Sequence, residues 1–143
     1  MNMNSMMFIN MFIIQYVFMS YVMTNSPANI TNSIGKIYMS TIMGLFMVVA
    51  GVLMQHKFNI KQLIVFVGLL IGCIYLYKIQ FGISDKEYLK EMIEHHSMAL
   101  LTSKAIIDKT KDNDVLKLAQ RIIQTQEKEI NEMQGLINRP DKV

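Results

Sequence analysis

The sequence has a single cysteine among its 143 residues, and this scarcity excludes two kinds of site. Cys73 has no partner within the chain, so neither an intramolecular disulfide nor a cysteine-based zinc motif can form. The chain also has no phosphate-binding loop and no nucleophile paired with a base. The sequence therefore assigns no catalytic reaction.

Neither sign of charge predominates in the sequence. The 14 Lys and Arg residues exceed the 11 Asp and Glu residues by three, which gives a formal net charge of +3. The basic residues are scattered among acidic ones, mostly after residue 78. Because a nucleic-acid interface needs a basic patch, no nucleic-acid partner is expected.

Hydrophobic residues are abundant instead, at 52% of the chain, and they concentrate in its first 80 residues. The runs 6–24 and 37–54 contain no charged residue, and a third run, 62–77, lies between Lys61 and Lys78. A membrane-spanning helix needs about 20 mainly apolar residues. We therefore predict three spans, the third reaching about residue 80 with its lysines extended toward the interface.

The first run does not resemble a secretory signal peptide, because no basic segment precedes it and no clear small-x-small cleavage site follows it. Its Asn10 and Gln15 make an interfacial helix the alternative to a span. Residues 25–36, with Pro27 and Gly35, are predicted to form a loop.

Orientation depends on few charges. The short loop 55–61 is basic and carries His56, and short basic loops tend to remain in the cytoplasm. Three spans then leave the amino terminus inside and the carboxy-terminal region outside. We therefore predict a multi-pass integral membrane protein with a membrane region at 1–80 and a non-cytoplasmic region at 81–143. Other basic residues favour the opposite orientation: Lys36, Lys78 and Lys86.

The region 81–143 has the pattern of a helical hairpin. Ser84 and Glu87 form a capping box, which predicts a helix to about Lys109. After a polar break at 110–113, a second helix should run over 114–137 and end at Arg139-Pro140. Two helices joined by so short a turn should pack antiparallel. Their inward stripes follow the helical period: Leu89, Met92, Ile93, His96, Leu100, Ser103 and Ile107, then Val115, Ala119, Ile122, Ile123, Gln126, Ile130, Met133 and Ile137.

Polar side chains interrupt both stripes at the same height. Counted from Lys111 as the apex, His96 lies fifteen residues before it and Gln126 fifteen residues after it. Imidazole combined with thioether favours soft or borderline metals, copper above all. The sequence therefore predicts a copper site among Met92, His95, His96, Gln126, Glu129 and Met133.

These residues also have simpler interpretations. His96 can be a core residue that hydrogen-bonds Gln126 across the hairpin, and methionine on a helix face usually contributes packing.

Eleven of the 14 methionines lie in the first 54 residues, many spaced by four. On helices they would form stripes able to pass Cu(I) through a membrane, or they are simply apolar residues. Gly44, Ala50 and Gly51 predict a close contact between spanning helices.

Two stretches of the hairpin resemble the domain of unknown function 305 family. One is Tyr88-Leu89-Lys90-Glu91-Met92-Ile93-Glu94-His95-His96-Ser97-Met98-Ala99, and the other is Ala119-x-x-Ile122-Ile123-x-x-Gln126-x-x-Glu129-Ile130-x-x-Met133. The resemblance covers about residues 84–137. It implies a ferritin-like helical architecture and, for some members, copper binding through His and Met.

The chain departs from that family pattern at two points. Glu94 replaces the usual proline before the histidine pair, so the helix starts at Ser84 instead. Larger members carry two hairpins, whereas this chain carries one, so a complete four-helix bundle would need a partner such as a second copy. Di-iron sites in such bundles use Glu-x-x-His, but Met92 and Ile93 stand three residues before the histidines. A di-iron oxidase is therefore not expected.

Together these features predict an all-α membrane protein with three transmembrane helices followed by an antiparallel helical hairpin. The leading hypothesis is a membrane-anchored protein that binds copper in homeostasis or sequestration. The alternative is a structural or assembly protein in which the hairpin forms a homodimer and holds no metal. The expected partners are the lipid bilayer and a second copy of the chain.

Overall fold

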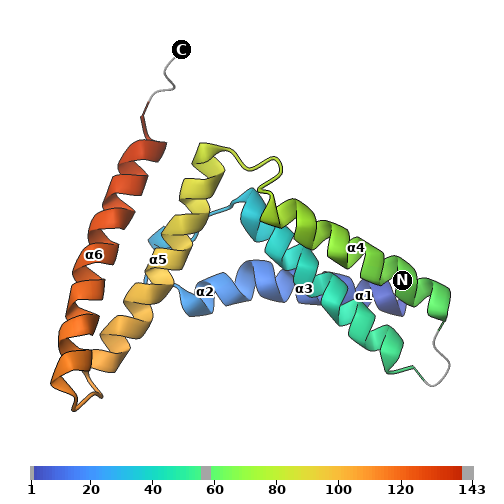
Figure 1. Ribbon diagram of the computed structural model, residues 1–143, viewed down its shortest axis with the longest axis horizontal. Helices are drawn as coiled ribbons and strands as arrows, with labels where there is room; N and C mark the ends of the chain where they lie inside the picture. Colours follow the sequence, from blue (N-terminus) through green and yellow to red (C-terminus); the bar gives the residue numbers. More distant parts are fainter. Residues whose placement is uncertain (1, 56–58, 140–143) are drawn as a thin grey trace. The chain divides into compact units, whose positions relative to one another are not determined.

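The computed structural model describes residues 2–55 and 59–139, and the regular structure of these residues is all helical, as predicted (Figure 1). His56 and Pro140, which figured in the sequence predictions, lie outside the described residues. The chain divides into two compact units, Met1–Met19 with Ile34–Ile83 and Ser20–Ser33 with Ser84–Val143. The elements are α1 (Met3–Ile13), the π-helix η1 (Ile14–Met19), α2 (Ser20–Met23), the 3₁₀ turn η2 (Pro27–Asn29), α3 (Ile34–Leu53), α4 (Ile60–Lys78), α5 (Asp85–Ile107) and α6 (Asn113–Ile137).

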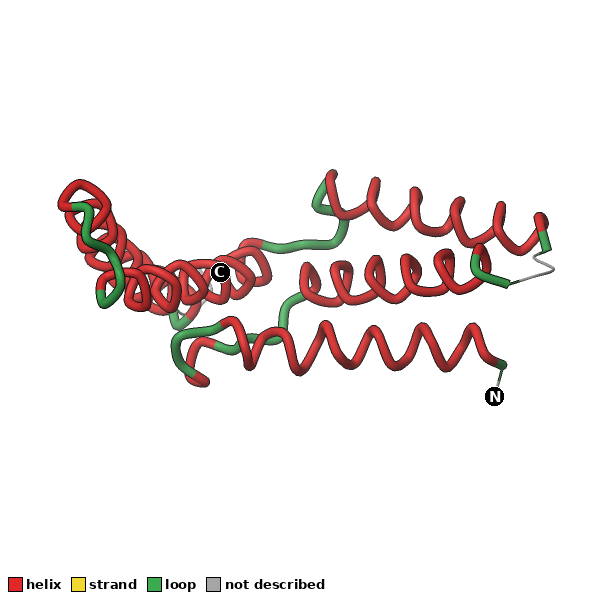
Figure 2. Tube along the Cα trace, turned by 90° about the horizontal axis from the view of Figure 1, so that it is seen from below, coloured by secondary structure: helices red, strands yellow, loops and turns green. Residues whose placement is uncertain are grey.

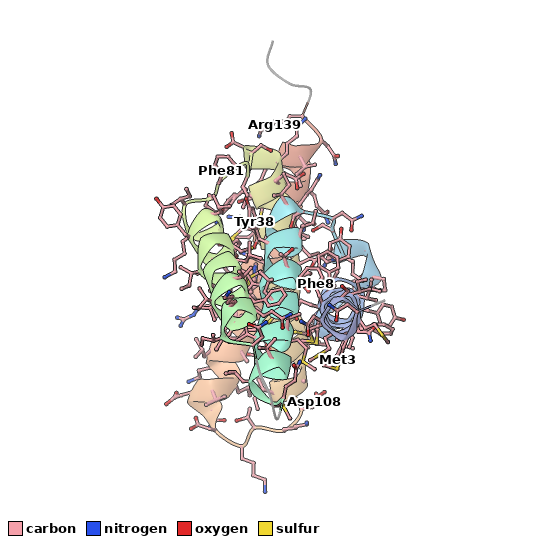
Figure 3. The ribbon with its side chains drawn as sticks, turned by 90° about the vertical axis from the view of Figure 1, so that its right-hand side faces the viewer. Met3, Phe8, Tyr38, Phe81, Asp108 and Arg139 are labelled. Atoms are coloured by element: carbon pink, nitrogen blue, oxygen red, sulfur yellow. The ribbon has the colours of Figure 1, made fainter. Side chains whose placement is uncertain are left out.

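The first unit is a layer of three helices with α3 in the middle. Figure 2 shows α1, α3 and α4 side by side, and α3 packs against both neighbours. Ile42 and Leu45 of α3 are buried together with Leu70 of α4. At the end of the layer where α3 begins and α4 ends, the hydroxyl of Tyr38 donates to the carbonyl of Phe81 at 3.1 Å (Figure 3).

Two glycines of α3, Gly44 and Gly51, let α1 approach closely as predicted, whereas Ala50, named with them, is exposed. A Cβ atom added at Gly44 would lie 2.8 Å from the ring of Phe8 and 3.2 Å from the carbonyl oxygen of Phe8. A Cβ atom added at Gly51 would collide with the end of the Met7 side chain. Figure 3 shows Phe8 between α1 and α3. Small residues at such contacts allow two backbones to pack without intervening side chains.

Three helical segments among the described residues are long and apolar enough to cross a membrane: Met3–Met23, Ile34–Leu53 and Ile60–Lys78, with mean hydropathies of 1.6, 1.8 and 2.0. They start and end within three residues of the predicted spans. Many of their large apolar side chains are exposed in the isolated chain, Phe18, Phe46 and Ile64 among them. Exposed apolar faces on such helices fit a hydrocarbon surrounding.

The second unit contains the predicted hairpin. Ser84 caps α5 by accepting the backbone N–H of Glu87, and Asp112 caps α6 by accepting that of Asp114 at 2.8 Å. The inward stripes meet in a core of Ile93, Leu100, Ile130 and Met133, against which Leu89, Met92, Ile123 and Ile137 pack. One predicted core position is wrong. Val115 is 40% exposed, because it lies in the first turn of α6 beside the end of α5.

Candidate functional site

The histidine pair lies in the middle of α5, and its two members face different surroundings. Consecutive residues of an α-helix are rotated by about 100° from each other. His96 therefore turns toward α6, where its Nδ1 atom lies 3.1 Å from Oε2 of Glu129. His95 turns away from that interface, and half of its side chain is exposed. The structure does not place the two imidazoles on one face.

The Nδ1 atom of His96 is buried but poorly satisfied. Although Glu129 is close, no well-directed hydrogen bond to Nδ1 exists among the described residues. The imidazole as a whole is 22% exposed and Glu129 is 41% exposed, so the pair lies at the edge of the hairpin core. Buried nitrogen atoms rarely lack a directed hydrogen bond, so this one calls for an explanation.

The surroundings of His95 favour its protonated form. Its Nε2 atom lies 3.8 Å from Oε1 of Glu91, one turn earlier on α5. The interaction with the Glu91 carboxylate raises the pKa of His95, with a smaller contribution from the charge of Glu94, and outweighs the opposing effect of burial. Because metals bind the neutral imidazole, this raised pKa would oppose metal binding by His95 as pH falls.

Both candidate methionines lie beside the His96–Glu129 contact in the hairpin. Met92 is one turn before His96 on α5, and Met133 is one turn after Glu129 on α6, so each thioether shares a helix face with one member of the contact. Met133 is buried in the hairpin core and Met92 packs against that core. Gln126, one turn before Ile130, is half-buried.

These residues form a mixed set of possible ligands. Across residues 2–55 and 59–139, no three His, Cys, Asp or Glu side chains converge on one point. A metal at the hairpin would therefore need the thioethers of Met92 and Met133 in addition to His96 and Glu129. An imidazole and two thioethers are donor types that suit Cu(I), and Nδ1 of His96 is buried without a directed hydrogen bond, so these residue types fit copper.

A polar cluster that the sequence did not predict holds the same turn of α5. Segment 20–33 packs against α5, and we refer to its contacts with Glu94 and Ser97 as the polar anchor. The carboxylate of Glu94 accepts the hydroxyl of Ser20 at 3.0 Å and the backbone N–H of Thr31 at 2.6 Å. The anchor therefore fixes the residue immediately before the histidine pair.

The other half of the polar anchor is Ser97, directly after the pair. Its side chain is fully buried and accepts the backbone N–H of Asn25 at 2.9 Å and the side-chain amide of Asn29 at 3.2 Å. The sequence predicted residues 25–36 only as a loop between spans. The available signal was a small polar residue, Ser97, inside an apolar stretch, together with the Asn and Ser residues of the loop.

Comparison with known proteins agrees with the helical motifs. Residues 76–139 match the family described as Domain of unknown function (DUF305). The chain is 36% identical over 136 residues to the uncharacterized protein L153 of Acanthamoeba polyphaga mimivirus, an alignment that covers 93% of this chain and 90% of the viral protein. No solved structure matches the chain. On the family match and this relative, the chain belongs to the DUF305 family.

Proposed function

We propose that this protein is a membrane-anchored copper-binding protein whose metal site lies at the His96–Glu129 contact of the hairpin. The observation that carries the proposal is the buried Nδ1 atom of His96, 3.1 Å from a carboxylate and without a directed hydrogen bond. His96, Met92 and Met133 would hold the metal, with Glu129 orienting the imidazole or adding an oxygen ligand. Bound there, copper would be sequestered between two helices.

His95 has a different role in this proposal. Its exposed imidazole lies outside the interface and is paired with Glu91. It would act as an entry ligand that takes up the metal when deprotonated. The membrane helices would hold the hairpin at a bilayer surface, and we propose the non-cytoplasmic side. Cysteine accessibility on a Cys73→Ser background, at Ser5 and Asn138 from each side, tests that orientation.

Copper titration of the full chain in detergent tests the metal site. The parent protein should bind one Cu(I) in competition with a chromophoric chelator and bind Cu(II) more weakly. His96→Ala should lose affinity most, and Glu129→Gln should lose about 10- to 100-fold, as expected for an outer partner of a metal ligand. The matched control is Glu132→Gln, an exposed carboxylate on the same helix. Unchanged Cu(I) affinity in His96→Ala would rule the site out.

A second candidate function is assembly through the hairpin, in which a second copy completes a four-helix bundle. The observation that favours it is apolar exposure on this unit: Tyr88 is 51% exposed and Leu118 is 46% exposed. A hairpin of this size buries little apolar surface alone, and a twofold dimer would cover more of it. Sedimentation of the full chain in detergent, with and without copper, decides this. A monomer in both conditions at high micromolar concentration would contradict the dimer.

A further inference from the structure

The three-helix unit contains a cavity that the copper site does not use. It has a volume of about 380 Å³ and lies near the end of the layer where α1 begins, α3 ends and α4 begins. Its polar lining comes from the start of α1, at Asn2, Asn4 and Ser5. Its apolar lining includes Phe8 of α1, Val48 of α3 and Phe66 of α4. The cavity is therefore polar on one side and aromatic or aliphatic on the other.

Asn4 carries the unusual feature of this cavity. The residue is only 8% exposed, and its side-chain oxygen Oδ1 is buried without a hydrogen-bond partner among the described residues. The backbone N–H of Asn4 is already bonded to Oδ1 of Asn2, the cap of α1, at 3.4 Å. Buried acceptors in folded proteins are almost always paired. Asn4 also lines the cavity, so a donor that displaces the atoms covering Oδ1 would satisfy this acceptor.

We propose that the cavity binds a phospholipid with a primary ammonium headgroup, of the phosphatidylethanolamine class, whose ammonium donates to Oδ1 of Asn4. The position fits, because the ends of spanning helices lie at headgroup depth. The start of α1 has no acidic residue in its first turn, so the positive end of its helix dipole favours the lipid phosphate. The rings of Phe8 and Phe66 supply an apolar surface for the first part of an acyl chain.

The hydrogen-bond acceptor and the apolar lining of the cavity favour this lipid over other possible occupants. A choline headgroup carries the same phosphate but has no N–H to donate, so it cannot satisfy Asn4. A water-soluble headgroup lacks the acyl chain that the aromatic side of the cavity would accommodate. The apolar side is continuous with membrane-exposed surface, because Ile9, which also lines the cavity, is 41% exposed on α1.

Lipid retention by the full chain tests the proposal. The protein is reconstituted in vesicles of equal phosphatidylethanolamine and phosphatidylcholine with identical acyl chains, extracted in mild detergent and analysed by native mass spectrometry. The parent should retain phosphatidylethanolamine over phosphatidylcholine by about tenfold, the factor for one hydrogen bond from a charged donor. Asn4→Leu should remove the preference, while Asn4→Asp, which keeps an acceptor, should retain it. Equal retention of both lipids by the parent would overturn the proposal.

Further experiments distinguish loss of lipid binding from loss of folding. They also distinguish recognition of the whole lipid from recognition of its headgroup alone. Asn10→Leu, at an exposed Asn of the same helix, is the matched control and should keep the preference. In micelles without phosphatidylethanolamine, Asn4→Leu should be as stable as the parent or more stable, because it removes an unpaired buried acceptor. A lower Tm there would show that Asn4 already has a structural partner, and would count against the proposal. Glycerophosphoethanolamine should compete far more weakly than the lipid, and equal competition would overturn the acyl-chain contact.

Discussion

The carboxylate of Glu94 accepts the backbone N–H of Thr31 at 2.6 Å, across sixty-three positions of sequence. The hydroxyl of Thr31 in turn donates to the carbonyl of Lys90 at 2.6 Å, one turn earlier on α5. Two short bonds thus tie one residue of the 20–33 segment to two successive turns of the helix that carries the histidines. The position of His96 against α6 therefore depends on a segment that lies far away in the chain.

Glu94→Ala should loosen this segment. The substitution leaves the N–H of Thr31 and the hydroxyl of Ser20 without their acceptor, and the loss of a charged hydrogen-bond partner costs about 1–3 kcal/mol. Hydrogen exchange of the Thr31 amide in detergent should accelerate accordingly. Glu132→Ala, at an exposed carboxylate whose ion pair spans 3.8 Å, should change stability by less than about 0.5 kcal/mol. Equal effects of the two variants would contradict the anchor.

Gly44→Ala should destabilise the packing of α1 on α3. The new methyl group would lie 3.2 Å from the carbonyl oxygen of Phe8, a backbone atom that cannot rotate away. Overpacking of this kind costs about 1–3 kcal/mol, measurable as a lower Tm in detergent. The control is Gly72→Ala on α4, where no atom lies within 4 Å of the added carbon. There the higher helix propensity of alanine should leave Tm unchanged or raised.

The substitution Met133→Leu distinguishes a metal-binding role of Met133 from a packing role. Leucine has nearly the volume of methionine, so the core of the hairpin should lose less than about 1.5 kcal/mol. If the thioether binds copper, Cu(I) affinity should nevertheless fall clearly while stability stays near that of the parent. Met98→Leu, outside the hairpin core, is the matched control. If Met133→Leu binds Cu(I) as tightly as the parent, Met133 is not a ligand and contributes only to packing.

The Glu91–His95 pair should make stability depend on pH in one direction. The pKa of His95 is raised in the folded protein, so the pair contributes fully below the unfolded pKa of about 6.5 and is lost as pH rises through the folded value. The parent should thus lose a few tenths of a kcal/mol between about pH 6 and pH 8, a small effect because the imidazole is half exposed. Glu91→Gln should flatten this dependence and lower the pKa of His95 in an NMR titration. An unchanged titration would contradict the pairing.

The helices and their caps could be predicted because their signals are local. Ser84 precedes a stretch of helical period and caps α5 as expected, and Asp112, which caps α6, lies in the predicted polar break at 110–113. Contacts across the hairpin were harder to predict. Counting from Lys111 pairs His96 with Gln126, yet the observed contact is with Glu129, one turn further on. Helical side chains lean toward the amino-terminal end of their own helix, so in an antiparallel pair they meet beyond the residue at equal height.

The polar anchor could not be predicted for a different reason. Its members come from a loop and a helix about seventy residues apart, and hydrogen bonds between such segments leave no periodic pattern in the sequence. Hydrophobic periodicity reports which face of a helix is buried, but not which segment covers it. Ser97, fully buried on α5, could be recognised as a contact only once Asn25 and Asn29 were placed against it.

The unbroken course of α5 sets the electrostatic environment of the histidines. In the family pattern a proline precedes the pair and opens a helix there, which places both imidazoles at its positive end, where the dipole opposes protonation. Here Glu94 continues the helix, and His95 lies about three turns after Asp85, beyond the reach of that dipole. The charge of His95 is then governed by a nearby carboxylate, that of Glu91, which raises its pKa. Exchanging one residue before the pair thus moves the electrostatic control of His95 from the backbone to a side chain.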